Sequence, residues 1–172
     1  MEIRLTKAVT KDLPQLLSIC KAAATTEGST WDQNYPNSEI LAEDIRNGAL
    51  YRIEADGNVI GLLSLGETGE LDMLSDPSDG THPFDFARFG IHPAYQGKGA
   101  GHKALTAAIT LCREKGGSAV RVLASPGNPA ALSVYRKAGF VKMRLVHLWE
   151  HDYWYLRKAI SRDDIGFVRR KS

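Results

Sequence analysis

The chain has few cysteines, no long apolar run and little net charge, and each absence excludes a class of protein. Its 172 residues include two cysteines, Cys20 and Cys112, so neither a disulfide framework nor a cysteine metal cage is expected. No stretch approaches the roughly 18 apolar residues of a membrane span, and the N-terminal segment lacks the apolar region of a signal peptide. A formal net charge of +2 gives no reason to expect nucleic acid or membrane partners. We therefore expect a cytoplasmic protein with reduced thiols.

The length predicts a single domain over residues 1–172, with a charged tail over 160–172. Strand patterns occur over residues 3–8, 50–55, 59–65, 84–91, 119–124, 140–150 and 152–158. Helical patterns occur over residues 10–24, 38–48, 99–115 and 128–139. We expect Thr10 and Ser38 to cap the first two helices, and residues 66–83 to form a long loop. Strands that alternate with helices centrally and form hairpins at both ends predict a mixed sheet in an α/β or α+β domain.

The segment Gln96–Gly101 joins the end of a strand pattern to the start of a helical one through a glycine-rich turn. N–H groups at a helix N-terminus lack intrahelical partners and carry the positive end of the helix dipole. Glycines at positions 97, 99 and 101 let a phosphate approach this backbone without meeting a side chain. The segment therefore predicts a site for a phosphate-bearing ligand in a parallel strand–helix–strand unit over residues 84–124. A glycine-rich turn without a ligand is the alternative.

Two other glycine loops do not fit this segment. The dinucleotide-binding pattern needs a glycine at its sixth position, where His102 or Ala104 stands here. A P-loop needs Ser or Thr after its lysine, whereas Lys98 is followed by Gly99. The ligand is therefore not expected to be held by either of these two loops.

Three pieces of the sequence, in order, resemble the GNAT superfamily of N-acetyltransferases. Gln96–Gly101 resembles the acetyl-CoA signature of that family: Gln or Arg, two residues, Gly, one residue, then Gly or Ala. Upstream, Phe89–Pro93 resembles the strand end Leu-Ala-Val-x-Pro. Downstream, Asn128–Ala131 and Tyr135–Phe140 resemble the segments Asn-x-x-Ala and Tyr-x-Lys-x-Gly-Phe. The resemblance covers nearly the whole chain and implies a central, mostly antiparallel twisted sheet flanked by helices, with the parallel unit forming the acetyl-CoA site.

The resemblance implies acetyl-CoA as the acetyl donor and no metal. The backbone of residues 89–91 would pair with the pantetheine arm, and Gly90, which replaces a more usual alanine, would permit a bulge. N–H groups of residues 97–102 would hold the pyrophosphate, Asn128 would contact the cofactor, and Tyr135 would lie near the thioester sulfur. The implied cofactor-binding residues are Phe89, Gly90, Ile91, Gln96, Gly97, Lys98, Gly99, Ala100, Gly101, His102, Asn128 and Tyr135.

Acyl transfer from a thioester to an amine needs a neutral nucleophile, a stabilised oxyanion and a protonated leaving thiolate. A backbone N–H at the splayed strand, such as that of Ile91, can polarise the carbonyl. A tyrosine has an ordinary pKa near ~10 and a thiol one near ~8.5, so a tyrosine hydroxyl can donate a proton to the departing thiolate. We therefore expect Tyr135 to act as general acid and the backbone of Ile91 to polarise the carbonyl.

The general base and the acceptor site are less well defined by the sequence. Candidates for the base lie on the central strand, next to its end or on the loop before it: Asp85, His92, Glu67, Glu70 and Asp72. Candidates for acceptor binding are Trp31, Tyr35 and Asp85. For each of these residues a solvated, salt-bridged or packed side chain is the alternative.

The sequence predicts an enzyme that transfers the acetyl group of acetyl-CoA to a primary amine, directly and through a tetrahedral intermediate. The acceptor would be a small molecule or a peptide or protein amine. Two alternatives remain: a non-catalytic CoA-binding sensor or interaction module of the same fold, and a transferase for another acyl-CoA. A homodimer is among the expectations because relatives often dimerise.

Overall fold

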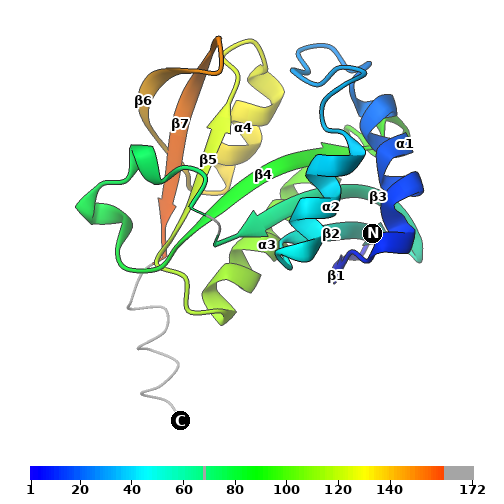
Figure 1. Cartoon of the computed structure of the whole chain (residues 1–172), viewed down its shortest axis with the longest axis horizontal. Coiled ribbons are helices and arrows are strands. Elements are labelled where there is room, and N and C mark those ends of the chain that lie inside the picture. Colours follow the sequence, from blue (N-terminus) through cyan, green and yellow to red (C-terminus); the bar gives the residue numbers. More distant parts are fainter. Residues whose placement is uncertain (68, 161–172) are drawn as a thin grey trace.

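The protein is described by a computed structural model, over residues 1–67 and 69–160, and is built around one seven-stranded twisted sheet (Figure 1). Its strands are β1 (Ile3–Lys7), β2 (Leu50–Ala55), β3 (Asn58–Gly66), β4 (Pro83–Ile91), β5 (Ala119–Ala124), β6 (Val141–Leu148) and β7 (His151–Ala159). They follow the spatial order β1-β2-β3-β4-β5-β7-β6. Neighbouring strands are antiparallel except β4 and β5, which are parallel. The predicted mixed, mostly antiparallel sheet with a parallel strand–helix–strand unit is confirmed. The predicted tail lies outside the described residues apart from its first one.

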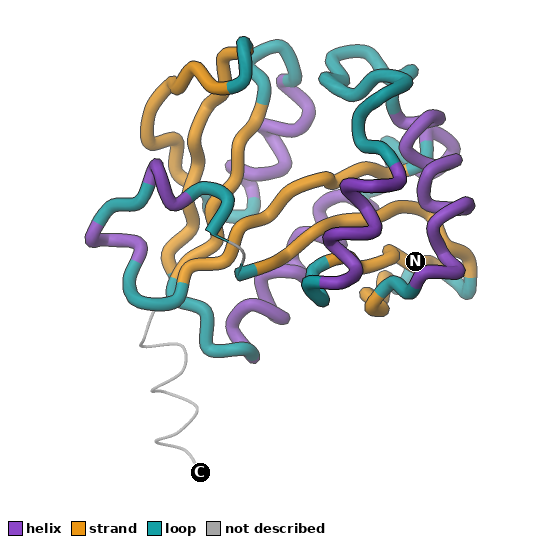
Figure 2. The backbone as a smooth tube through the Cα atoms, in the orientation of Figure 1, coloured by secondary structure: helices purple, strands orange, loops and turns teal. Residues whose placement is uncertain are grey.

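Helices cover both faces of the sheet, as Figures 1 and 2 show. They are α1 (Leu13–Ala23), α2 (Ser38–Arg46), α3 (Ala100–Glu114) and α4 (Pro129–Lys137). Leu50 and Leu62 pack with α1 and α2, whereas their neighbours Tyr51 and Leu63 belong to the core under α3 and α4. Successive strand residues point to opposite faces, so one strand supplies both cores. Among the described residues, no helix has the length and apolarity needed to span a bilayer.

Two helix starts differ from the prediction by one turn or less. Thr10 begins a short 3-10 turn, Thr10–Asp12, and α1 follows it. Ser38 is the first residue of α2, and its cap is Asn37, whose side chain accepts a hydrogen bond from the Ile40 N–H at 3.0 Å. An Asn side chain one residue upstream reaches the third N–H of the helix as well as a serine would, so the expected cap at Ser38 was wrong by one residue. The expected cap at Thr10 was also wrong, because a 3-10 turn separates it from α1.

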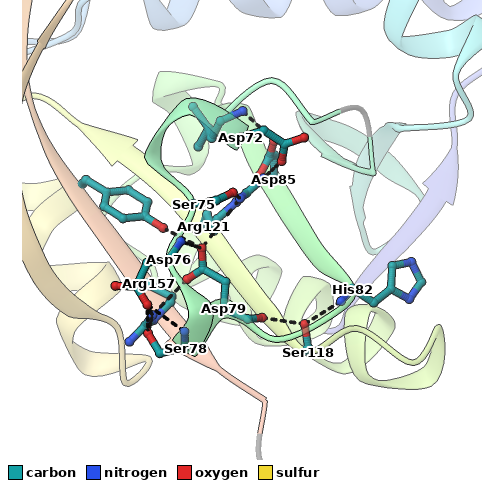
Figure 3. Close-up of polar contacts among 12 residues, drawn as sticks. Asp72, Ser75, Asp76, Ser78, Asp79, His82, Asp85, Ser118, Arg121 and Arg157 are labelled. Atoms are coloured by element: carbon teal, nitrogen blue, oxygen red, sulfur yellow. Dashed lines mark hydrogen bonds and ion pairs between the residues drawn. The ribbon is translucent and has the colours of Figure 1, made fainter.

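The expected long loop between β3 and β4 contains two 3-10 turns, Asp72–Leu74 and Pro77–Asp79. It packs on the sheet around the buried guanidinium of Arg121 (Figure 3). Nε of Arg121 donates to Asp85 at 2.7 Å, and its two terminal nitrogens donate to Ser75 and Asp72 at 2.8 and 2.9 Å. We call these contacts the Arg121 network. They fix this loop beside the strand that carries the site.

Candidate active site

Strands β4 and β5 pair only at their beginnings and then diverge. The parallel register joins residues 83–85 of β4 to residues 119–121 of β5. A cavity of about 540 Å³, here called the donor groove, lies where the strands have separated. Its walls come from the second half of β4, the glycine turn, the end of β5, α4, and the end of α1 with the segment after it. The carboxyl ends of parallel strands are where α/β sheets bind ligands.

The strand β4 carries a bulge, as expected, but the bulge lies at Arg88 rather than at Gly90. Ala87 pairs with Ser64 and Gly90 pairs with Leu62, so two residues of β4 face one residue of β3. Arg88 has a φ of 47°, in the left-handed region. The bulge changes the direction of β4 and separates it from β5.

The missing side chain of Gly90 makes room for the ring of Trp31. A Cβ built at Gly90 would lie 2.5 Å from two atoms of the Trp31 ring. The glycine that departs from the family pattern therefore lets the segment between α1 and α2 pack directly on β4. Trp31 consequently lines the donor groove.

The backbone of Ile91 faces the donor groove. The N–H of His92 donates to the carbonyl of Ile60 in β3 at 2.7 Å. Because N–H groups alternate along an antiparallel strand, the N–H of Ile91 points away from β3, toward the groove. The Gln96 side chain donates to the Ile91 carbonyl at 2.8 Å and to Thr26 Oγ1 at 3.2 Å. Gln96 thus ties the strand end to the α1–α2 segment.

The glycine turn presents backbone donors at the start of α3. Gly97 and Gly99 have φ values of 75° and 82°, which glycine adopts without strain. The first intrahelical bond runs from the Lys103 N–H to the Gly99 carbonyl at 3.1 Å, so the N–H groups of residues 100–102 precede the helical ladder. A Cβ at Gly97 or Gly99 would meet no atom within 4 Å. The turn therefore offers unobstructed N–H groups to an anion.

Most of the residues predicted to bind the cofactor lie together along this groove. Those that line it are Phe89, Gly90, Ile91, Gln96, Gly97, Gly99, Gly101, His102, Asn128 and Tyr135. Two do not: Lys98 Nζ lies 6.0 Å from the centre of the Tyr95 ring, and the Ala100 side chain is buried in the core. At Ala100 only the backbone is available to a ligand in the groove.

Tyr135 and Asn128 lie on α4 and at its start, across the groove from Ile91. Tyr135 is buried, with its ring edge-on to Phe86 at 6.2 Å. Burial raises the pKa of Tyr135 above its ordinary value, so the hydroxyl keeps its proton throughout the neutral range. The Asn128 side chain accepts from the Ala131 N–H at 3.1 Å and caps α4, which leaves its amide nitrogen as a donor.

A second cavity of about 740 Å³, here called the acceptor cavity, adjoins the donor groove. The two cavities share Thr30, Trp31, Ala87, Arg88 and Leu123. The three residues predicted to bind the acceptor, Trp31, Tyr35 and Asp85, all line it. Asp85 has both carboxylate oxygens occupied, one by Arg121 and the other by the Leu71 N–H at 2.9 Å. These bonds give Asp85 a structural role in the wall of the cavity.

The structure separates the five candidates for the general base. Glu70 and Asp85 line the acceptor cavity. The other three line neither cavity and have partners elsewhere: Glu67 pairs with His82 at 2.9 Å, Asp72 bonds Arg121, and His92 accepts from the Ala94 N–H at 3.1 Å. Glu70 is therefore the candidate whose position suits a base.

Arg88 is a prominent residue of the site that was not predicted. It binds Asp44 of α2 through two nitrogens, one of them at 2.8 Å, and approaches Glu70 at 3.4 Å. Burial disfavours its charge, but hydrogen bonding to Asp44 raises the pKa of Arg88 above its ordinary value. The available signal was an arginine within the mostly apolar run of residues 84–91, where Asp85 is the other charged residue, since a buried arginine needs a partner.

Comparison with known proteins identifies the family of the chain. The family model described as "Acetyltransferase (GNAT) family" matches residues 13–140, and the chain belongs to this family, as the sequence predicted. A search of the curated proteins gives no match. The fold is shared with the acetyltransferase AAC(6')-Ib solved with ribostamycin and coenzyme A, at a TM-score of 0.74, 18% identity and 98% coverage of both chains.

Two further solved structures are similar at comparable levels. YncA from Salmonella typhimurium, solved with its cofactor acetyl-CoA, has a TM-score of 0.70 and 18% identity, covering 94% of this chain and 96% of its own. A ribosomal-protein-alanine N-acetyltransferase from Brucella melitensis has a TM-score of 0.70 and 22% identity, covering 93% and 100%. Within residues 1–67 and 69–160, no group of three or more His, Cys, Asp or Glu is arranged to hold a metal ion.

Proposed function

We propose that the protein is an acetyl-CoA-dependent N-acetyltransferase that acetylates a primary amine by direct transfer. The observation that carries this proposal is the junction of two cavities at Ala87 and Arg88, with Ile91 and Tyr135 on the donor side. Family membership supports acyl transfer. The solved complexes of similar proteins with acetyl-CoA, or with coenzyme A and an aminoglycoside, support this donor and a small amine acceptor.

The donor groove suits the two chemically distinct parts of acetyl-CoA. Its pyrophosphate would accept hydrogen bonds from the N–H groups of residues 97–102 at the positive end of α3. Its pantetheine amides would pair with the groove-facing edge of β4 beyond the bulge, as an added strand does. This arrangement would bring the thioester between Ile91 and Tyr135.

The chemistry then follows from groups that the chain provides. The ammonium of the acceptor loses a proton to Glu70 or to water, and the free amine attacks the thioester carbon. The Ile91 N–H stabilises the oxyanion that forms. As the intermediate collapses, the C–S bond breaks, the new C–N bond remains, and Tyr135 donates its proton to the departing thiolate. The nitrogen of the intermediate gives up its extra proton to water, and Tyr135 regains a proton from water before the next turnover.

Neither cysteine suits a covalent acetyl-enzyme, which favours direct transfer. Cys20 and Cys112 are both buried and line neither cavity. Burial raises the pKa of Cys20 to about 12 and that of Cys112 to about 11. A thiolate nucleophile is therefore not available near neutral pH.

Replacing Tyr135 with phenylalanine tests the proposal. We expect Tyr135→Phe to lower kcat by about 10²–10⁴-fold, the usual contribution of a positioned acid, while the Kd for acetyl-CoA changes little. Thiol release over a panel of amines measures kcat, and calorimetry measures Kd. Because burial raises the pKa of Tyr135, the wild-type rate should not fall through ionisation of this tyrosine until the pH exceeds about 10.

The matched control is Tyr51→Phe, which removes the hydroxyl of a buried tyrosine in the same core that lines neither cavity. An unchanged rate in Tyr135→Phe would remove its assignment as the acid. If acetyl-CoA binds but no amine in a broad panel is acetylated, the alternative of a non-catalytic CoA-binding module replaces the enzyme.

A further inference from the structure

The acceptor cavity has an excess of negative charge. Four carboxylates among its lining residues, those of Asp32, Glu43, Asp44 and Glu70, share the space with a single arginine, Arg88. The lining also includes Asp85, but its charge is matched by Arg121 at 2.7 Å. Of the described residues that line this cavity, Arg88 is the only lysine or arginine.

Arg88 is not free to bind an anionic group of an acceptor. Its side chain is 9% exposed and engages both carboxylate oxygens of Asp44. This bidentate pair already uses two donor nitrogens of the guanidinium. Glu70 also approaches the guanidinium, at 3.4 Å. An acceptor carboxylate would therefore meet Asp32, Glu43 and Glu70 without a compensating cation.

Aromatic side chains from two separate parts of the chain also line the cavity. Trp31 and Tyr35 come from the α1–α2 segment, and Trp149 and Tyr153 come from the β6–β7 hairpin. In Figure 1 this segment and the hairpin turn lie at the same end of the sheet. The faces of such rings attract cations, and a volume of about 740 Å³ exceeds what one amino group needs.

The hairpin turn holds Trp149 at the cavity in spite of an unfavourable backbone. Trp149 and Glu150 have φ values of 50° and 66°, a conformation for which hairpin turns usually use Asn or Gly. Trp149 is 56% exposed, and its ring lies edge-on to that of Tyr153 at 6.4 Å. An indole exposed in this way presents a large surface to whatever enters the cavity.

We infer that the acceptor is a small amine that carries a second positive charge. The inference rests on the proposed function and names its substrate class. The reacting amine lies at the junction with the donor groove, near Ala87. The second cation lies among the aromatic rings and is bound by the carboxylates of Asp32 and Glu43. The acyl transfer is unchanged: a C–N bond replaces the C–S bond, and the thiolate takes a proton from Tyr135.

Two amines of equal chain length test this inference: 1,6-diaminohexane and 1-aminohexane. We expect kcat/KM for the diamine to be at least about tenfold higher, the usual effect of a hydrogen bond to a charged group. Glu43→Gln and Asp32→Asn should each lower this ratio several-fold. Added salt should lower it as well, because the second contact is between charges.

The matched control is Glu39→Gln, which removes a carboxylate one turn earlier on the helix that carries Glu43 and does not line the cavity. This variant should keep the wild-type ratio. A ratio near one in the wild type, or a ratio that neither Glu43→Gln nor Asp32→Asn changes, would overturn the inference.

Binding separates this inference from the proposed function. Calorimetry on the protein saturated with coenzyme A measures the Kd of both amines whether or not either is acetylated. Tighter binding of the diamine, lost in Glu43→Gln, supports the inference even if turnover fails. Equal binding of the two amines contradicts it, whereas acetylation of both at equal rates leaves the proposed function intact.

Discussion

Gly90 and Trp31 determine how closely the α1–α2 segment approaches the strand that carries the site. A Cβ at position 90 would lie 2.5 Å from two atoms of the Trp31 ring. Any residue other than glycine would therefore clash with this ring. Trp31 also lines both cavities. A single missing side chain therefore affects the donor groove and the acceptor cavity together.

Gly90→Ala should displace the Trp31 ring. We expect a loss of about 1–3 kcal/mol in the free energy of unfolding, as for other overpacked sites, and a higher KM for the acceptor. Urea unfolding and steady-state kinetics measure the two effects. In a Trp31→Ala background the added methyl group has no ring to meet, so the same substitution should have little effect there. An equal loss in both backgrounds would contradict the steric explanation.

Among single residues, the sequence predicted those whose role depends on the local backbone conformation. Gly97 and Gly99 adopt left-handed conformations at the turn where they were expected to expose N–H groups. The ion pair between Arg88 and Asp44 was not predicted, because it joins residues 44 positions apart whose proximity depends on how α2 packs against the sheet. The contact between Gly90 and the Trp31 ring was not predicted either, because Trp31 is distant in the sequence.

Among the elements, the loop between β3 and β4 owes its shape to the Arg121 network. The side chain of Arg121 is 1% exposed and lies between Asp85, directly opposite on β4, and Asp79 of the loop. Both aspartates are buried. The adjoining part of the loop carries Glu70 and Leu71, which line the acceptor cavity. The network thus supports one wall of the acceptor cavity, which Asp85 itself lines.

Arg121→Met should leave Asp85 and Asp79 buried without their cation. Removing one partner of a buried ion pair usually costs about 3–5 kcal/mol, and we expect a loss of this size in urea unfolding, with a higher KM for the acceptor. Arg4→Gln is the control, because the Arg4–Glu2 pair is 3.9 Å long and exposed on both sides and should contribute under about 1 kcal/mol. A loss of the same small size in Arg121→Met would show that the network does not hold the loop.

The order and type of the helices and strands were predictable because each has a clear period and clear end signals. β5 occupies residues 119–124, as expected from its apolar run, and α3 begins at the glycine turn. The shape of the β3–β4 loop was not predictable. It depends on the register that sets Asp85 opposite Arg121, and a register between strands 36 residues apart leaves no local pattern.

Across the whole molecule, one departure from regular pairing creates the site. β4 pairs with β5 for three residues, bends at the bulge and leaves the donor groove between them. The acceptor cavity adjoins this groove at Ala87 and Arg88 and is lined by the α1–α2 segment and the β6–β7 hairpin. The two substrates would therefore enter separately and meet beside Arg88, which is the arrangement that direct transfer requires.

The structure of the protein with bound acetyl-CoA tests this account most directly. We expect the pyrophosphate on the N–H groups of residues 97–102, the thioester oxygen facing the Ile91 N–H, and the sulfur within hydrogen-bonding distance of the Tyr135 hydroxyl. Acetyl-CoA bound outside the donor groove, or bound within it with its thioester remote from both Ile91 and Tyr135, would contradict the account.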